Sequence, residues 1–283
     1  MPVVLPMLAT AGTTVPTGSE WAHELKWDGI RLLVDCSEAG VRMTTRNGND
    51  RTASWPSIVT HPGYDVLLDG EVVAFAPDGR PHLGALGGGA QAQLMVFDLL
   101  RLHEQDTTGL PWTARRHLLE SLDLGGWQLP EVHDDGSMLL DFTRAHGIEG
   151  IVSKRRDSAY EPGIRSKNWL KFVHRHRDSY VVGGWRPQVG TDDRLASLLV
   201  GEVTADGLQY RGRVGSGISS RDSVALKALL APVQESPFSD EVPKLDARGT
   251  TWVAPTVVVD VESHGPAVHR LRQPSFIAVR SDL

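Results

Sequence analysis

The chain lacks several features that would assign it to a special class of protein. Its 283 residues include one cysteine, Cys36, which excludes an internal disulfide and a cysteine-rich zinc site. No apolar run approaches the roughly 20 residues that a membrane span requires. The first residues, MPVVLPMLATAG, have no basic segment and are broken by two prolines, unlike a signal peptide. These absences predict a cytoplasmic protein without a membrane partner.

The charge is weakly acidic overall but unevenly distributed. A formal net charge of −6 argues mildly against a nucleic-acid partner, because neutralising phosphate requires lysine and arginine. Residues 154–177, however, hold eight basic and two acidic residues, interleaved with Tyr160, Trp169 and Phe172. Such a run is typical of a solvated surface, but the aromatic residues also suit a groove that binds phosphates.

Length and patterning predict two domains and an α+β fold class. The first, residues 1–176, is expected to be mixed α/β with a mostly antiparallel sheet. Strands are expected at 31–35, 41–45, 65–75, 93–100, 150–155 and 168–173, helices at 113–122 and 137–146, and a flexible loop at 84–91. The second domain, residues 177–283, has the element order of a small OB-fold β-barrel. Its strands are expected at 180–185, 195–203, 208–214, 251–262 and 276–280, its helix at 220–230 and a loop at 232–249.

The hexapeptide Lys26-Trp27-Asp28-Gly29-Ile30-Arg31 is the most informative local motif. A lysine amine is a nucleophile only when neutral, and its ordinary pKa is about 10.4. A lysine nucleophile therefore needs burial or a neighbouring cation, and Arg31 is such a cation. Gly29 removes a side chain that would keep phosphate away. The pattern indicates a lysine held beside a nucleotide phosphate, although a surface lysine before a strand reads the same way.

Further motifs follow Lys26 in a fixed order. They are Thr45-Arg46-Asn47-Gly48, Leu68-Asp69-Gly70-Glu71, Phe97-Asp98, Glu149 to Lys154, Arg165 to Lys171, and Arg272 to Asp282. In this set the chain resembles the covalent nucleotidyltransferase superfamily, and most closely the bacterial ATP-dependent DNA ligases related to ligases C and D. The resemblance covers nearly the whole chain. It implies an adenylation domain over 1–176 and an OB-fold domain over 177–283.

The resemblance also implies a role for each motif residue. Lys26 would attack the α-phosphorus of ATP to give a lysyl-AMP, and Glu24 would accept a hydrogen bond from the adenine amino group. Phe97 would stack on the base, whereas Arg31 and Arg46 would contact phosphate or ribose. The remaining implied roles are Glu71 for ribose or metal, Glu149 for Mg²⁺ or Mn²⁺, Arg165, Lys167 and Lys171 for phosphate charge, Arg280 for the β- and γ-phosphates, Lys154 for the same phosphate charge or for DNA, and Arg211 and Arg213 for DNA. Asp28 would either orient the lysine amine or satisfy local backbone donors.

Two departures from the family pattern keep alternatives open. The usual second lysine after Trp169-Leu170-Lys171 is replaced by Val173, and the chain ends in Leu283 where the family has lysine. The expected substrate is nicked duplex DNA, engaged weakly by a monomer, with help from partners such as a primase-polymerase or an end-binding repair protein. An RNA ligase, a capping-type nucleotidyltransferase, or a catalytically weakened nucleic-acid-binding module are the alternative functions.

Overall fold

A computed structural model describes residues 4–87, 91–191, 194–264 and 270–280. The chain divides into two compact units, Met1–Val173 and His174–Leu283, each of which is described separately. The predicted boundary after residue 176 lies three residues beyond this division. Within the described ranges, no helix has the length and apolar character needed to cross a membrane.

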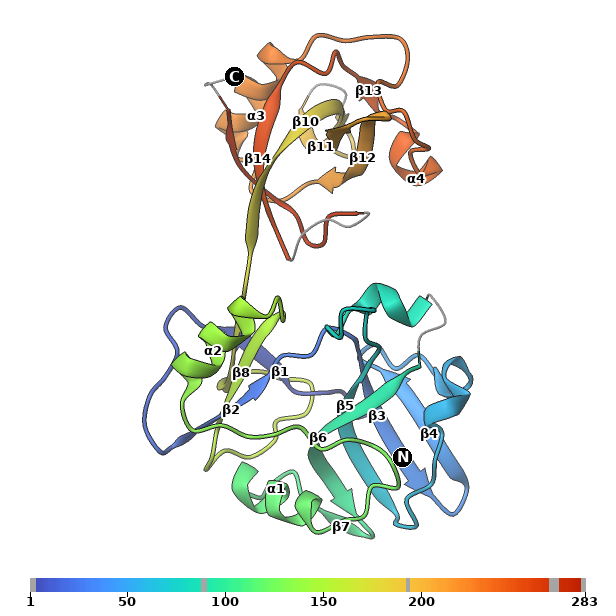
Figure 1. The fold of residues 1–283 in the computed structure, drawn as a ribbon, viewed down its shortest axis with the longest axis vertical. Coiled ribbons are helices and arrows are strands. Elements are labelled where there is room, and N and C mark those ends of the chain that lie inside the picture. The colour runs from blue at the N-terminus through green and yellow to red at the C-terminus, as the bar shows by residue number, and fades with distance from the viewer. Residues whose placement is uncertain (1–3, 88–90, 192–193, 265–269, 281–283) are drawn as a thin grey trace. The chain divides into compact units, whose positions relative to one another are not determined.

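The first unit is built on two sheets (Figure 1). The four-stranded sheet has the order β1-β9-β8-β2, formed by Leu8–Ala11, Arg165–Val173, Gly150–Arg155 and Trp21–Leu25. The five-stranded sheet has the order β4-β3-β5-β6-β7, formed by Gly40–Thr45, Ile30–Ser37, Val66–Val73, Gln93–Leu102 and Gln105–Asp106. The pairing of β1 with β9 is parallel and the other pairings are antiparallel, in agreement with the prediction of mostly antiparallel sheets.

Helices cover these sheets where the sequence predicts them. Helix α1, Trp112–Glu120, packs against β6, and α2, Gly136–Ala145, packs against β8 and β2. Asp135 caps α2 by accepting a hydrogen bond from the Met138 backbone N–H. Buried leucine and valine side chains of β3, β5 and β6 form the main core of this unit.

Several elements of the first unit differ from the prediction. The sequence did not predict strands β1, β2 and β7, or the short 3₁₀ helices Thr52–Ser54 and Pro56–Ile58. The expected loop at 84–91 begins as a 3₁₀ helix, Leu83–Gly87, and its residues 88–90 lie outside the described ranges. Strand β2 matters most, because it carries Glu24 and leads directly into Lys26.

The second unit is a six-stranded antiparallel sheet. Its strands run β12-β11-β10-β14-β15, and β13 pairs with β10. The bounds are β10 His176–Pro187, β11 Leu195–Thr204, β12 Gly207–Val214, β13 Thr251–Trp252, β14 Val258–Ser263 and β15 Ser275–Val279. Helix α3, Ser220–Leu229, follows β12 and starts with a capping box at Ser219.

Three features of this unit refine the prediction. The expected strand 251–262 is two strands, because Pro255 has no N–H to donate to a ladder. The expected loop 232–249 contains a short helix, α4, Lys244–Ala247. Among the described residues no ladder closes the sheet, and a single parallel bridge joins Ser216 after β12 to Ser275 of β15.

Candidate active site

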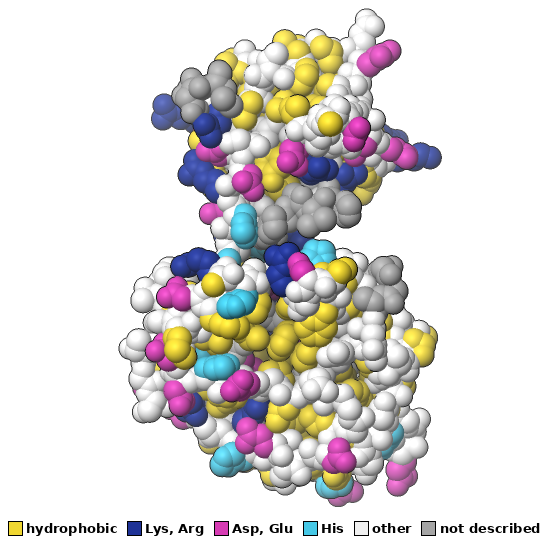
Figure 2. All heavy atoms as spheres, viewed as in Figure 1, with side chains coloured by type: hydrophobic (Ala, Val, Ile, Leu, Met, Phe, Trp, Pro, Cys, Tyr) yellow, Lys and Arg dark blue, Asp and Glu magenta, His cyan; other side chains and the backbone are white. Residues whose placement is uncertain are grey.

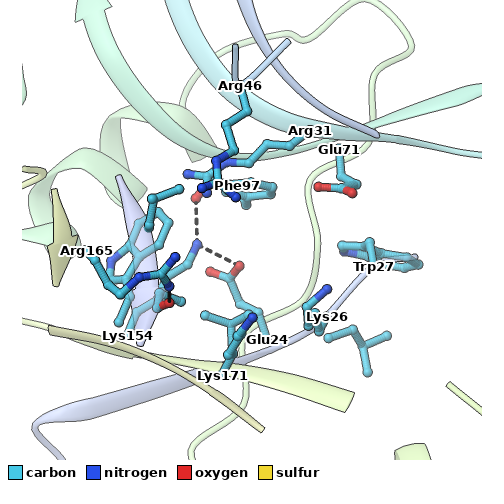
Figure 3. Close-up of a pocket in the computed structure, with 15 residues that line it drawn as sticks. Glu24, Lys26, Trp27, Arg31, Arg46, Glu71, Phe97, Lys154, Arg165 and Lys171 are labelled. Atoms are coloured by element: carbon cyan, nitrogen blue, oxygen red, sulfur yellow. Dashed lines mark hydrogen bonds and ion pairs between the residues drawn. The ribbon is translucent and has the colours of Figure 1, made fainter. Parts of the chain in front are cut away.

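A cavity of about 250 Å³ opens in the first unit, with walls from both of its sheets (Figure 3). The four-stranded sheet contributes residues of β1, β2, β8 and β9, and the five-stranded sheet contributes Arg31, Glu71 and Phe97. The structure thus brings together most of the predicted nucleotide site. The predicted residues that line the cavity are Glu24, Lys26, Arg31, Arg46, Glu71, Phe97, Lys154, Arg165 and Lys171.

Lys26 is positioned by the end of β2. Its backbone N–H donates to the Gly150 carbonyl over 2.8 Å, which holds the residue beside the start of β8. Its Nζ donates to Oε2 of Glu149 over 2.7 Å, and the two side chains are 25% and 11% exposed. The predicted nucleophile and the predicted metal ligand are therefore an ion pair in this structure.

Two glycines allow the strands around Lys26 to approach closely. A Cβ on Gly150 would lie 2.0 Å from the Phe172 carbonyl oxygen, and Gly150 has a φ of +148°. A Cβ on Gly29 would lie 2.0 Å from the Val72 carbonyl oxygen. Gly29 thus allows close contact with strand β5, and its expected role of leaving room for phosphate stays a prediction.

Glu24 and Lys154 form a buried pair inside the cavity. The residues are 3% and 1% exposed, and Lys154 Nζ donates to Glu24 Oε2 over 2.8 Å and to the Phe97 carbonyl over 3.1 Å. The ammonium also lies 4.6 Å from the ring centroids of Phe97 and Trp169. Oε1 of Glu24 is buried and has no hydrogen-bond partner among the described residues. Burial raises the pKa of Glu24, and the charge of Lys154 opposes that rise.

Lys154 was predicted to offset phosphate charge or to contact DNA, and its burial contradicts the second of these roles. Strand β8 alternates its side chains, and Val152 and Lys154 share the face that lines the cavity. The ammonium is enclosed by Glu24, Phe97 and Trp169, which leaves no surface for a DNA phosphate. Its position in a basic run of the sequence suggests an exposed side chain, but the side chain is buried.

Arg31 is held by Asp69, which was not among the predicted site residues. Its Nε and Nη2 donate to the two oxygens of Asp69 over 2.9 and 2.5 Å, and Asp69 is fully buried. The Tyr160 hydroxyl donates to Asp69 over 2.6 Å. The available signal was the carboxylate at position 69 in a strand that is otherwise buried, since such a group needs a cationic or hydrogen-bonding partner.

Burial also changes the titration of two other cavity residues. The pKa of Glu71 is raised to about 8 by burial, against the opposing charges of Lys26 and Arg31. The pKa of Lys171 is lowered, first by burial and then by the nearby charges of Lys26 and Arg165. Arg165 donates to the Ala9 carbonyl over 2.6 Å, and Arg46 is exposed at the rim.

Some predicted residues lie elsewhere. Lys167 is exposed on β9 and does not line the cavity. Arg280 belongs to the second unit, where it donates to Ser179 over 3.1 Å. In the same unit Arg211 and Arg213 form ion pairs with Glu202 and Asp246, at 2.9 and 3.5 Å. Leu283 lies outside the described residues.

Asp28 is buried and accepts a hydrogen bond from the Leu83 backbone N–H over 3.2 Å. This donor lies 55 residues further along the chain and is not local, so both predicted roles of Asp28 stay predictions. In the described part of the chain, no cluster of three or more His, Cys, Asp or Glu side chains could hold a metal by itself.

Comparison with known families agrees with this geometry. Residues 6–172 match the ATP dependent DNA ligase domain, and residues 191–283 match the ATP dependent DNA ligase C terminal region. The chain belongs to the ATP-dependent DNA ligase family, which confirms the resemblance found in its motifs. It has the nucleotidyltransferase fold of these ligases, rich in sheet and with few helices.

The relatives include multifunctional end-joining proteins. LigD of Mycobacterium tuberculosis, a multifunctional non-homologous end joining DNA repair protein, is 40% identical over 98% of this chain and 38% of its own length. LigD of Pseudomonas aeruginosa is 31% identical over 99% of this chain and 36% of its own length. The chain thus spans less than half the length of these relatives.

Solved structures are similar over the whole chain. The ligase domain of M. tuberculosis LigD is 37% identical with a TM-score of 0.60, over 99% of this chain and 96% of that one. A mycobacterial DNA ligase D complexed with ATP and MES is also 37% identical, with a TM-score of 0.61 and the same coverage.

Proposed function

We propose that the chain seals nicks between a 3′-hydroxyl and a 5′-phosphate in duplex DNA, using ATP and a lysyl-AMP intermediate on Lys26. The observation that carries the proposal is a lysine at the wall of a cavity that also holds an unpartnered carboxylate oxygen, an aromatic ring and several cations. Such a set of groups matches the parts of a nucleoside triphosphate. Membership of the ligase family supports this assignment.

The pair of Glu24 and Lys154 is suited to recognise adenine. The free Oε1 of Glu24 can accept a hydrogen bond from the adenine amino group. Guanine carries a carbonyl oxygen in that position, which a carboxylate would repel. Lys154 opposes the rise in the pKa of Glu24 that burial causes and orients the carboxylate, and Phe97 offers an aromatic surface for the base.

The sugar and the phosphates are assigned to the remaining walls. With a pKa of about 8, Glu71 is mostly protonated at neutral pH, so that it can both donate to and accept from a ribose hydroxyl. Arg31 is already oriented by Asp69 and pays little conformational entropy on binding. Arg46, Arg165 and Lys171 supply positive charge for the triphosphate.

Glu149 is the residue that would hold Mg²⁺ or Mn²⁺. Its carboxylate offers the hard oxygen ligand that these ions prefer, and the absence of a three-residue cluster among the described residues fits an ion that shares substrate phosphates and water. When bound, such an ion would neutralise phosphate charge in the transition state. Glu71 is the weaker candidate, because its raised pKa favours the neutral acid.

The reaction then proceeds in three displacements at phosphorus. The deprotonated Lys26 amine attacks the α-phosphorus, a P–N bond forms, and the P–O bond to pyrophosphate breaks. A 5′-phosphate oxygen of the nick attacks the lysyl-AMP, which breaks the P–N bond and returns the amine. The 3′-hydroxyl finally loses its proton, attacks the 5′-phosphate and expels AMP, which leaves a phosphodiester bond. The role of Lys171 and Arg165 is to offset the charge that develops at each centre.

The second unit is proposed to be an OB-fold barrel that assists both nucleotide and DNA. The strand order, the helix after β12 and the bridge between Ser216 and Ser275 support this fold. Arg280 would contact the β- and γ-phosphates during the first step. Arg211 and Arg213 are candidates for DNA phosphate, although each would have to exchange a carboxylate partner for it.

The names of the LigD relatives suggest the pathway. We extend the end-joining role of those proteins to this chain, acting as a monomer together with a primase-polymerase or an end-binding repair protein. The proposed site needs no base-specific contact, since sealing must succeed at any sequence.

The test is sealing of a nicked duplex by the wild type and by Lys26→Ala, with ATP and either magnesium or manganese. The wild type is expected to join the strands and to carry AMP on Lys26, and the variant to do neither. Joining by a folded Lys26→Ala protein would contradict the mechanism. Labelling by GTP alone would indicate a capping-type enzyme, sealing confined to RNA would indicate an RNA ligase, and nick binding without an adduct would indicate a binding module.

A further inference from the structure

A second cavity, of about 630 Å³, lies in the first unit and is mainly apolar. Its lining includes Leu25, Trp27, Met95, Leu129, Met138 and Phe142, and we name it the α2 groove. Met138 and Phe142 of α2 are 63% and 46% exposed, and both line the groove together with other apolar side chains. Figure 2 shows hydrophobic side chains gathered on this face of the unit, with acidic and histidine side chains beside them. The volume falls in the range of pockets that bind ligands.

The α2 groove adjoins the candidate active site. Leu25 and Trp27 line both cavities, and they are the residues on either side of Lys26. An occupant of the groove would therefore contact the segment that positions the nucleophile. This location gives a bound partner a route to influence the first step of the reaction.

The charges at the groove identify the kind of occupant. Among the described residues, Glu131 is the acidic residue that lines it, and no lysine or arginine does. The segment 131–141 contains Glu131, Asp134, Asp135 and Asp141 and has no lysine or arginine. Within this segment Asp134 and Asp141 pair with Arg156 and Arg144, at 2.5 and 3.3 Å, and Glu131 is the carboxylate that lines the groove.

We infer that the α2 groove is a docking surface for a protein segment that carries apolar side chains flanked by lysine or arginine. Apolar side chains would fill the groove, as in other modes of peptide recognition. The basic residues would face Glu131, and electrostatic complementarity would set specificity. A DNA backbone is disfavoured, because its phosphates would meet carboxylates rather than cations.

The five methionines of the chain provide the readout. In protein labelled with ¹³C-methyl methionine, Met95 and Met138 report on the groove, whereas Met7 and Met43 are fully buried in other parts of the unit. Three short synthetic peptides are added in turn: one with leucine and phenylalanine flanked by lysine, one with glutamate in place of lysine, and one with serine in place of the apolar residues. A nicked duplex serves as a fourth probe.

The basic apolar peptide is expected to shift the Met95 and Met138 signals saturably and to leave those of Met7 and Met43 in place. Phe142→Glu should weaken its binding by about tenfold or more, since it removes an apolar contact, and Val224→Glu on exposed α3 is the matched control. Glu131→Lys should weaken the basic peptide and strengthen the acidic one. Any of three results would overturn the inference. They are the absence of groove shifts with the basic peptide, equal shifts with the acidic or serine peptide, and groove shifts produced by the duplex.

Discussion

Replacing Lys154 by methionine tests the buried pair on which adenine recognition is proposed to depend. The side chains of Lys154 and Glu24 are 2% and 4% exposed, and their charged atoms are 2.8 Å apart. Removal of one partner from a buried ion pair costs about 3–5 kcal/mol, because the other charge is left uncompensated. That loss is a large fraction of the roughly 5–15 kcal/mol that stabilises a typical domain.

The loss should depend on pH. Without Lys154, burial is expected to raise the pKa of Glu24 further above its unfolded value of about 4.3. A carboxyl group whose folded pKa is raised contributes stability at low pH and loses it as pH rises. The Lys154→Met deficit should therefore be smallest below the unfolded pKa of about 4.3 and should grow as the pH rises above it.

Urea unfolding of four proteins checks this reasoning. They are the wild type, Lys154→Met, the double variant Glu24→Gln/Lys154→Met, and the control Lys167→Met, which changes an exposed lysine of the neighbouring strand. The double variant should recover most of the loss, because replacing both charges of a buried pair is often nearly neutral. The control should stay within about 0.5 kcal/mol of the wild type. A deficit that is independent of pH, or one that the double variant retains in full, would refute the account.

Three further predictions concern single residues of the cavity. Lys26→Ala should keep the wild-type far-UV circular dichroism and lose the AMP adduct in mass spectrometry. Asp69→Asn should raise the KM for ATP about tenfold, because Arg31 loses a charged hydrogen-bond partner worth about 1.5–3 kcal/mol; an unchanged KM would contradict the positioning role. Glu71 has a folded pKa raised to about 8, so its contribution to stability should fall as pH rises from about 4.3 to about 8, and urea unfolding of Glu71→Gln should lack this decline.

The parts of the fold that sequence predicted are those with strong local signals. Strands β3, β5 and β6 alternate or are continuously apolar, and α2 begins at a capping aspartate and ends before Gly147. The sequence did not predict strands β1 and β2, because each is stabilised by pairing with a strand far along the chain. β1 pairs with β9, and β2 pairs with β8, each more than 120 residues further along the chain.

The site residues divide in the same way into features that the sequence predicted and features that it did not. The order of the motifs predicted that Lys26, Glu71 and Phe97 belong to one site, and all three line one cavity. It did not reveal which charged groups pair in the folded state, because an ion pair joins residues by geometry rather than by spacing. Lys154 was therefore assigned to a basic run although it faces Glu24, and Asp69 was not recognised as the partner of Arg31.

The contact between Lys26 and Glu149 bears on the order of events in catalysis. An ammonium donating to a carboxylate over 2.7 Å has no lone pair available for phosphorus, so this arrangement is a resting state of the proposed enzyme. The amine can become nucleophilic only when the negative charge of Glu149 is engaged by another partner and the proton leaves. In the proposed mechanism the same carboxylate would couple occupancy of the nucleotide site to activation of the nucleophile. Glu149 directly precedes β8 and Lys26 directly follows β2, which pairs with β8, so the fold places the two groups side by side.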